Sequence, residues 1–190
     1  EMVKNIAKQV IVTNPADVDT LLASKFVDND AVTIKDIITE KIAKIGENMT
    51  MRRFVRFEGN VVDYIHMGGR IGVMVNFDLD GAENDVITEV KKDIAMQVAA
   101  AMPQFLDRES VPAEVIEKEK EILSAQALNE GKPANIVEKM VMGRINKFYK
   151  EICLALQAFI KDGDLDVTKY VTNNGGELVS STSFVVGEGI

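Results

Sequence analysis

The most distinctive set of chemically capable residues is the loop His66-Met67-Gly68-Gly69-Arg70-Ile71-Gly72, which holds the only histidine of the chain. Glycines beside an arginine could form a turn that binds phosphate. A P-loop, however, continues into Lys-Ser/Thr and opens a helix, so that its amides and ammonium group converge on the phosphate. Here the glycines lead into the apolar stretch 71–77, which has strand character. A glycine turn between two strands is therefore favoured over a nucleotide site.

Other residues that could support catalysis are sparse. With one histidine, the chain offers neither a multi-histidine metal site nor several candidates for a histidine base. Cys153 is the only cysteine, which excludes an internal disulfide and fits a reducing cytoplasm. Its apolar surroundings, ICLAL, favour a buried inert thiol over a reactive one. No nucleophile, base and orienting group occur together, so we predict a protein that is not an enzyme and needs no cofactor or metal.

The charge balance narrows the class of partner. The chain has 190 residues and a net charge of −8, from 22 basic and 30 acidic side chains. A negative surface disfavours non-specific binding to nucleic acid or anionic membrane, both of which attract cationic proteins. No apolar run approaches the roughly 20 residues that span a bilayer. We therefore expect a cytoplasmic module that binds another protein.

Hydrophobic spacing predicts the elements that must position these residues. The clearest helix is 33–45, where isoleucines recur at steps of three and four, with Thr33 as N-cap and Gly46 as stop. Other helices are expected at 2–12, 16–23, 84–101, 112–130, 134–152 and 166–173. Strands are expected at 49–57, 61–66, 70–78 and 177–186, with 67–69 as a hairpin loop.

Two of these helices, 112–130 and 134–152, are joined by the short turn Gly131-Lys132-Pro133. The first is strongly charged, with EKEKE at 117–121, and its apolar stripe is narrow. Narrow stripes on charged helices are typical of coiled-coil-like hairpins. We predict a helical arm; an ordinary helix pair packed on the main core is the alternative.

The sequence also contains an internal repeat. GENMTMRRFVRFEG (46–59) and GELVSSTSFVVGEG (176–189) agree at six of fourteen positions at a constant offset of 130. Chance similarity of two helix–turn–strand segments is the alternative, but the gapless register favours duplication. The predicted fold is therefore α+β, with two related subdomains, each a small antiparallel sheet packed with helices, plus an antiparallel helical-hairpin arm.

The repeat also suggests domain boundaries. We expect a core subdomain at 1–59, a second at 60–105 and 153–190, and an inserted arm at 106–152. The hairpin 61–78 of the second subdomain has no counterpart in the first, whose own hairpin is expected upstream of Glu1.

Several stretches of the chain resemble elongation factor Ts, in the order found in that family and with matching gaps. They are KIAKIGEN (41–48), RRFVRFEG (52–59), YIHMGGRIGV (64–73), VPAEVIEKEKEIL (111–123), ALNEGKP (127–133), EKMVMGRINKFYKE (138–151) and VGEGI (186–190). The resemblance implies an α+β core with a helical arm. It also implies a guanine-nucleotide exchange factor of translation elongation that binds the GTPase elongation factor Tu in its GDP form and releases GDP.

The resemblance further implies which residues contact the partner. Ile45 and Gly46, with the loop His66, Met67, Gly68 and Gly69, match motifs that contact the partner's nucleotide-binding domain. LQAFIKD (156–162) resembles a family segment near a second partner domain, which assigns Phe159 and Ile160. Ala158 stands where the family usually has proline.

Two further features of the resemblance bear on activity. The family's TDFV motif, which wedges beside the partner's magnesium site, and its small N-terminal helical module are both absent from the sequence, so weakened exchange activity is expected. The family has both monomeric and self-associating members, which leaves homodimerisation open. Two alternatives therefore stand: a structural, dimerising module, or a phosphate-binding enzyme that uses His66–Gly72.

Overall fold

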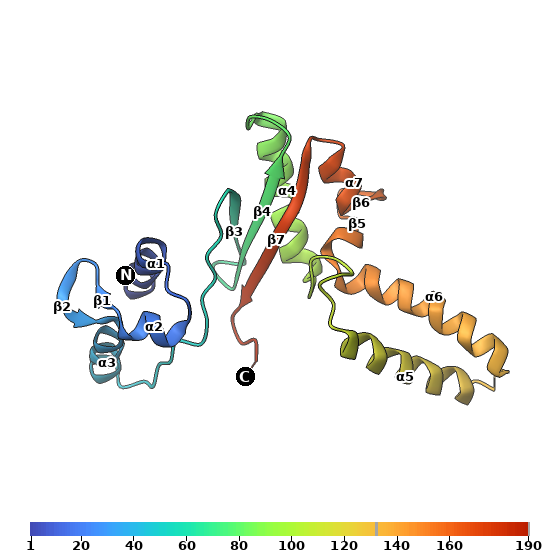
Figure 1. Cartoon of the computed structure of the whole chain (residues 1–190), viewed down its shortest axis with the longest axis horizontal. Coiled ribbons are helices and arrows are strands. Elements are labelled where there is room, and N and C mark those ends of the chain that lie inside the picture. Colours follow the sequence, from blue (N-terminus) through green and yellow to red (C-terminus); the bar gives the residue numbers. More distant parts are fainter. Residues whose placement is uncertain (132, 190) are drawn as a thin grey trace. The chain divides into compact units, whose positions relative to one another are not determined.

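The structure is a computed structural model, and it describes residues 1–131 and 133–189. Lys132, in the predicted turn at 131–133, and Ile190 lie outside the described residues. The chain divides into two compact units, Glu1–Phe57 (unit 1) and Glu58–Ile190 (unit 2). Helices and small antiparallel sheets make up both units, which confirms the predicted α+β class (Figure 1).

Unit 1 is built from short elements around a small core. They are α1 (Met2–Thr13), α2 (Val18–Ala23), β1 (Lys25–Phe26), β2 (Asn29–Thr33) and α3 (Ile34–Ile45). The start of α3 is the predicted Thr33 cap: its hydroxyl accepts from the Asp36 amide, while the Asp36 carboxylate accepts from the Thr33 amide. The reciprocal bonds satisfy amides that would otherwise lack partners at a helix start. Four buried side chains, Val10, Leu21, Ile34 and Ile38, form the core.

One predicted element of unit 1 is wrong. Residues 49–57 form no strand, although the structure describes all of them. The small sheet of this unit is the β1–β2 hairpin instead, which lies between the helices predicted at 16–23 and 33–45. Met49, Met51 and Phe54 pack on the unit 1 core. The apolar side chains at 49–57 favoured a strand in the sequence, but they serve the core of unit 1 instead, and the stretch belongs to none of the described sheets.

Unit 2 contains the main sheet. Its described strands are β3 (Asn60–His66), β4 (Ile71–Leu79) and β7 (Gly176–Val185), paired antiparallel in the order β3-β4-β7. Alternate residues of β4, namely Val73, Val75 and Phe77, are buried. Helix α4 (Asp85–Ala101) covers that face through Val90, Ile94 and Val98. All three predicted strands of this sheet and the helix are confirmed to within two residues at each end.

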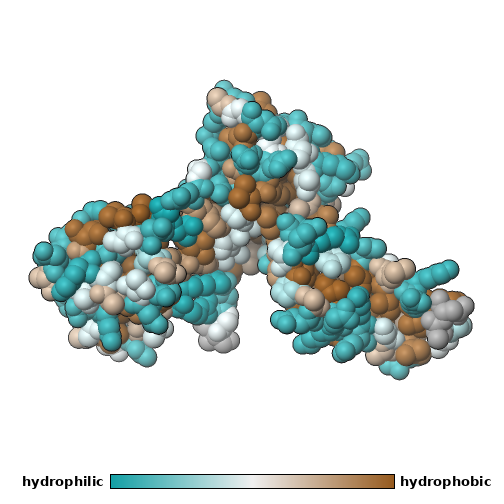
Figure 2. Space-filling model, in the orientation of Figure 1, coloured by the Kyte–Doolittle hydropathy of each residue, from teal (hydrophilic) through white to brown (hydrophobic). Residues whose placement is uncertain are grey.

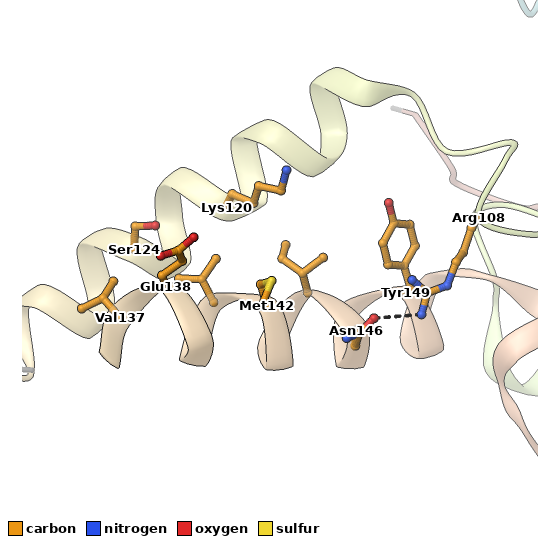
Figure 3. A pocket seen from close by; sticks show the side chains of 10 residues that line it. Arg108, Lys120, Ser124, Val137, Glu138, Met142, Asn146 and Tyr149 are labelled. Atoms are coloured by element: carbon orange, nitrogen blue, oxygen red, sulfur yellow. Dashed lines mark hydrogen bonds between the residues drawn. The ribbon is translucent and has the colours of Figure 1, made fainter. Parts of the chain in front are cut away.

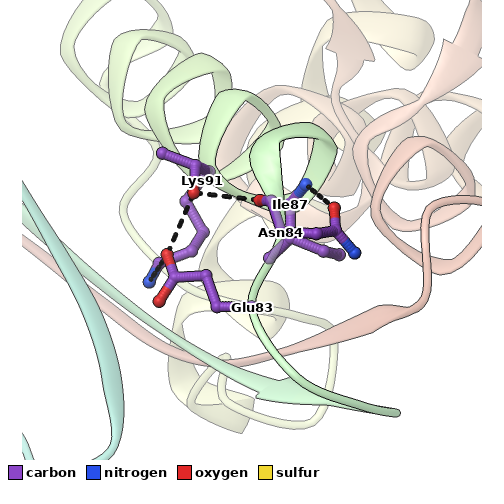
Figure 4. Close-up of polar contacts among 5 residues, drawn as sticks. Glu83, Asn84, Ile87 and Lys91 are labelled. Atoms are coloured by element: carbon purple, nitrogen blue, oxygen red, sulfur yellow. Dashed lines mark hydrogen bonds and ion pairs between the residues drawn. The ribbon is translucent and has the colours of Figure 1, made fainter.

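The start of α4 is fixed by polar contacts (Figure 4). The Asn84 side chain accepts a hydrogen bond from the Ile87 amide at 3.0 Å, and Lys91 Nζ lies 3.0 Å from Glu83 Oε1. The hydrogen bond and positive charge of Lys91 lower the pKa of Glu83. Since the Lys91 side chain is largely buried, the pair removes an unpartnered cation from the helix flank. These contacts fix the helix that carries Asp93 and Gln97, discussed below.

The two arm helices are α5 (Ala113–Asn129) and α6 (Ala134–Ile152). They lie side by side and have their own hydrophobic cluster, which includes Ile116, Leu123, Ala127, Val141 and Ile145. Figure 2 shows apolar surface along the seam between them, flanked by hydrophilic side chains. Because this cluster shares no buried residue with the cluster under the main sheet, the two helices pack chiefly on each other. The helical hairpin predicted from the narrow stripe is confirmed.

After α6 come a 3₁₀ turn, η1 (Leu154–Leu156), a hairpin of β5 (Ala158–Phe159) and β6 (Asp162–Asp166), and α7 (Val167–Thr172). The hairpin was not predicted. It repeats the β1–β2 hairpin: Lys25 pairs with Thr33 and Phe26 with Asn29, as Ala158 pairs with Asp166 and Phe159 with Asp162. Each of these residues in unit 2 follows its counterpart by 133 positions. The relation expected between the two halves is therefore seen in these hairpins, whereas of the two predicted strands only that at 177–186 forms.

The helix before each hairpin repeats as well. Gln97, Val98 and Pro103 follow Gln9, Val10 and Pro15 by 88 positions. Asn14 and Met102, which end the two helices, both adopt the left-handed conformation. In unit 1 the hairpin residue Phe26 follows Gln9 by 17 positions, whereas in unit 2 Phe159 follows Gln97 by 62. Unit 2 thus has 45 additional residues at the place where α5 and α6 occur.

Candidate partner-binding surface

The β3–β4 turn is held in a fixed conformation. Met67, Gly68 and Gly69 all have positive φ angles, of 50°, 64° and 97°. The His66 carbonyl accepts hydrogen bonds from the amides of Gly69 (3.2 Å) and Arg70 (3.1 Å). Glycine occupies two of these positions because other residues reach positive φ only with strain. The turn exposes Met67, whose relative exposure is 60%.

His66 packs beside this turn. Its Nδ1 lies 3.0 Å from the Tyr64 hydroxyl, and the two rings stack with centroids 5.6 Å apart. Tyr64 and His66 are both half-buried and lie on the same face of β3, since their positions differ by two. The contact fixes the orientation of the imidazole. The loop connects two strands and opens no helix, which is the arrangement favoured over a phosphate site.

The end of α3 forms a second turn. Gly46 has a φ of 81°, and its amide donates to the Ile42 carbonyl at 2.8 Å. An added Cβ at Gly46 would meet nothing within 4 Å, so backbone conformation and not space requires glycine here. Ile45, the last helical residue, has a relative exposure of 55%.

The β5–β6 hairpin forms a third turn, and its two predicted contact residues differ in burial. Phe159 is 3% exposed, and its ring stacks on Tyr170 with centroids 3.9 Å apart. Ile160, the next residue, is 49% exposed. Phe159 therefore anchors the hairpin in the core, while Ile160 presents an apolar side chain to solvent.

The predicted residues thus lie at three turns with one common property. Each turn has a fixed backbone and exposes one apolar side chain, namely Ile45, Met67 or Ile160. Ile45 and Gly46 belong to unit 1, and the other two turns belong to unit 2. Within unit 2, the β3–β4 turn is at the end of the sheet, away from the β5–β6 hairpin (Figure 1). Fixed turns with exposed apolar tips suit protein recognition, because little ordering entropy remains to be lost on binding.

Buried polar residues that no sequence pattern indicated support the third turn. Asp93, which is 3% exposed, accepts hydrogen bonds from Lys161 Nζ (2.6 Å) and the Tyr170 hydroxyl (2.9 Å). The hydrogen bond to Asp93 raises the pKa of Lys161. Burial, together with the same carboxylate, raises the pKa of Tyr170. A buried carboxylate with two donors holds α4, the hairpin and α7 together.

A groove runs between the arm helices (Figure 3). Arg108 donates to Asn146 Oδ1 at 3.0 Å, and its guanidinium lies 4.4 Å from the centroid of the Tyr149 ring. Val137, Val141, Met142 and Ile145 supply apolar walls, and Lys120 and Glu138 supply charge. The groove has a volume of about 620 Å³ and is open to solvent. Its walls are those of a helix-packing seam, with no convergent set of catalytic groups among the residues described.

The described residues offer neither a metal site nor a membrane span. No group of three or more His, Cys, Asp or Glu side chains there is placed to hold a metal ion. Nor does any helix in the described part of the chain have the length and apolarity needed to cross a membrane. Cys153 is fully buried, as predicted, and burial raises the pKa of its thiol. A raised pKa leaves little reactive thiolate at neutral pH.

Comparison with known proteins identifies the relatives of this chain. A family model described as "Elongation factor TS" matches residues 1–188. Elongation factor Ts of Clostridium botulinum (strain ATCC 19397 / Type A) is 46% identical over 199 residues, covering 100% of this chain and 64% of the relative. The protein of the same name from strain Eklund 17B / Type B is 50% identical over 194 residues, covering 97% and 63%. The Trichlorobacter lovleyi protein is 44% identical over 202 residues, covering 100% and 65%. The chain therefore spans about 64% of the length of the curated relatives it matches.

Proposed function

The chain belongs to the elongation factor Ts family, and from that premise we propose that it acts as a guanine-nucleotide exchange factor in translation elongation. Its partner is the GTPase elongation factor Tu in the GDP form, and it promotes GDP release in the cytoplasm. The observation that carries the proposal is the family match over residues 1–188. The factor itself makes and breaks no covalent bond.

The mechanism follows from thermodynamic linkage. A factor that binds the nucleotide-free GTPase more tightly than the GDP-bound form must weaken GDP binding by the same ratio. Each tenfold difference in affinity corresponds to about 1.4 kcal/mol. What the chain must provide is therefore a surface complementary to the empty state, not a reactive group.

The three turns supply that surface in our proposal. Ile45–Gly46 and the turn at 66–69 contact the nucleotide-binding domain of the partner, and the hairpin tip at Ile160 contacts a second domain. Exposed apolar side chains on fixed turns support this assignment, since they bury apolar area without ordering a loop. Phe159 takes part by anchoring the hairpin beneath Ile160.

We also propose the domain organisation that suits this role: a core subdomain at 1–59, a second at 60–105 and 153–190, and an inserted arm at 106–152. The 45 additional residues of unit 2 between glutamine and hairpin support an insertion into an ancestral repeat. Such insertions are tolerated at loops between elements that keep their own contacts.

The test is a titration of the chain into elongation factor Tu loaded with a fluorescent GDP. The proposal predicts faster release of the labelled nucleotide and a stable complex with the nucleotide-free GTPase. Absence of a complex under every nucleotide condition would refute it. Saturable binding of a small phosphate ligand to the isolated chain would support an enzyme instead, and self-association without a GTPase partner would support a structural module.

A further inference from the structure

Two glutamines are buried at matching places in the two units. Gln9 is 0% exposed and Gln97 is 1% exposed. A buried carboxamide costs free energy unless its donors and acceptor are paired. Each glutamine is paired with the backbone of the hairpin in its own unit, which means that the side chains have a specific structural task.

Gln97 bonds the peptide groups on both sides of Phe159. Its Nε2 donates to the Ala158 carbonyl at 3.2 Å, and its Oε1 accepts from the Ile160 amide at 2.8 Å. A second bond from Nε2 to Gln157 Oε1 at 3.1 Å uses its remaining donor capacity. The carboxamide thereby makes the hydrogen bonds that a neighbouring strand would make to β5, which is only two residues long.

Other contacts fix the residues on each side of Ile160. Phe159 stacks on Tyr170, and Lys161 is paired with Asp93. Ile160 is therefore an exposed apolar side chain whose own amide and both neighbours are held by α4 and α7. An ordinary hairpin tip needs no such buried polar support, but a contact that must meet a partner in one geometry benefits from it.

We propose that Gln97 is a positioning residue for partner binding, which fixes Ile160 in the geometry that the GTPase recognises. The inference rests on the proposed function, in which Ile160 is a contact residue. Gln97 itself touches no partner, because it is enclosed by its own unit.

Unit 1 supplies a matched control. Gln9 Nε2 donates to the Lys25 carbonyl at 2.7 Å, and its Oε1 accepts from the Val27 amide at 2.9 Å. The ion pair beside the tip has reversed polarity: Lys8 on the helix with Asp28 on the hairpin, where unit 2 has Asp93 and Lys161. Gln9 therefore makes the same bonds beneath a tip that carries Asp28 where the unit 2 tip carries Lys161, so a surface fitted to Ile160 and Lys161 would not match it.

The experiment compares Gln97→Leu with Gln9→Leu in the full chain. In the free chain, amide exchange at Ile160 is expected to rise about tenfold in Gln97→Leu, the effect of losing one net hydrogen bond. Affinity for nucleotide-free elongation factor Tu is expected to fall about tenfold in Gln97→Leu and to stay within about twofold of wild type in Gln9→Leu. Circular dichroism checks that both variants fold.

A conservative variant, Gln97→Glu, separates positioning from general stability and decides the question if Gln97→Leu does not fold. An ionised glutamate still accepts from the Ile160 amide but cannot donate to Ala158, whereas the protonated acid does both. Its affinity relative to wild type should therefore rise as pH is lowered. The charged and titratable groups around the site are Asp93 on α4, Lys161 in the hairpin and Tyr170 on α7. Because wild type carries the same groups, its affinity measured at each pH corrects for their titration.

Three outcomes would overturn the inference. If Gln97→Leu bound the GTPase as tightly as wild type, the hydrogen bonds of Gln97 to the hairpin would have a structural role only. Equal losses in Gln97→Leu and Gln9→Leu would indicate a general stability effect. A wild-type chain that does not bind the GTPase would refute the proposed function and this inference together, while the amide exchange at Ile160 would still report whether Gln97 fixes the hairpin.

Discussion

Several individual residues of this chain depart from the usual rule that apolar side chains are buried and polar ones exposed. Apolar side chains at the turns, such as Met67 and Ile160, are exposed, while polar side chains such as Asp93 and Gln97 are buried. The exposed residues lose hydrophobic free energy that burial would supply, and the buried ones are tolerated because each is hydrogen-bonded. Gln97 and Asp93 hold the hairpin on both sides of the Ile160 side chain, which presents this exposed residue in one geometry for binding.

His66 is the residue whose replacement tests the turn most directly. His66→Ala removes the ring but leaves the glycine turn and its backbone hydrogen bonds. We expect affinity for elongation factor Tu to fall about tenfold, as is common for a central interface side chain, with the fold unchanged by circular dichroism. Asp63→Ala, at an exposed position on the same strand, is the control and should bind as wild type. Equal affinity of both variants would remove His66 from the contact set.

Tyr170 gives a prediction about pH. Its raised pKa means that the folded state favours the neutral phenol, whereas the unfolded chain ionises near its ordinary value of 10.0. Stability should therefore fall as pH rises above about 10, and the raised pKa of Lys161 acts in the same direction. Tyr170→Phe loses the bond to Asp93 and should be less stable at pH 7 by about 1–2 kcal/mol. Urea unfolding at pH 7 and 10.5 should show a smaller pH-dependent loss in the variant; an equal loss would contradict the assignment.

At the scale of elements, glycine has opposite roles in the turns and in the arm. Gly68 has a positive φ angle, whereas Gly143 lies inside α6 and does not. An added Cβ would meet nothing within 4 Å at either position. Conformation alone therefore decides the effect of adding a side chain, which makes the two positions a matched pair.

We predict that Gly143→Ala stabilises the arm by about 0.5–1 kcal/mol, because alanine is the better helix former. Gly68→Ala should destabilise unit 2 by a similar amount, since alanine resists positive φ. Thermal unfolding followed by circular dichroism measures both. A destabilised Gly143→Ala variant would indicate that α6 needs glycine for close packing or bending.

At the scale of the whole molecule, the two units have separate cores of different size. All residues of unit 1 are described, and its cluster contains four buried hydrophobic residues, whereas twelve of the described residues form the cluster beneath the main sheet of unit 2. Small cores give small net stability, because conformational entropy grows with every ordered residue. The two units should therefore differ in their opening free energies.

Hydrogen exchange followed by mass spectrometry tests this difference. Amides of α1 and α3 should exchange through openings of lower free energy than those of β4 and α4. A low concentration of denaturant should increase the difference in exchange rate between the two units. Binding of the GTPase should slow exchange in unit 1 most, if Ile45 and Gly46 are contacts. Uniform protection across both units would show that they unfold as one cooperative body.

Elements whose signals are local could be predicted from the sequence. The spacing of isoleucines and the Thr33 cap gave α3, the glycines at 68 and 69 gave a hairpin turn, and the narrow stripe gave the arm, because periodicity and turn chemistry act over a few residues. The hairpins β1–β2 and β5–β6 could not be found in that way. Their strands have two and five residues, and each is completed by a glutamine on a helix distant in the chain.

Which residues form the repeat and the site became clear from the folded chain. Gln9 and Gln97 look like polar residues on helix faces until the fold buries them beneath a hairpin, although the shared Gln-Val and following proline at an offset of 88 was a signal in the sequence. For the same reason the strand predicted at 49–57 failed and Phe159 lies inside. Burial and hydrogen-bond partners depend on contacts between distant segments, and no local pattern encodes them.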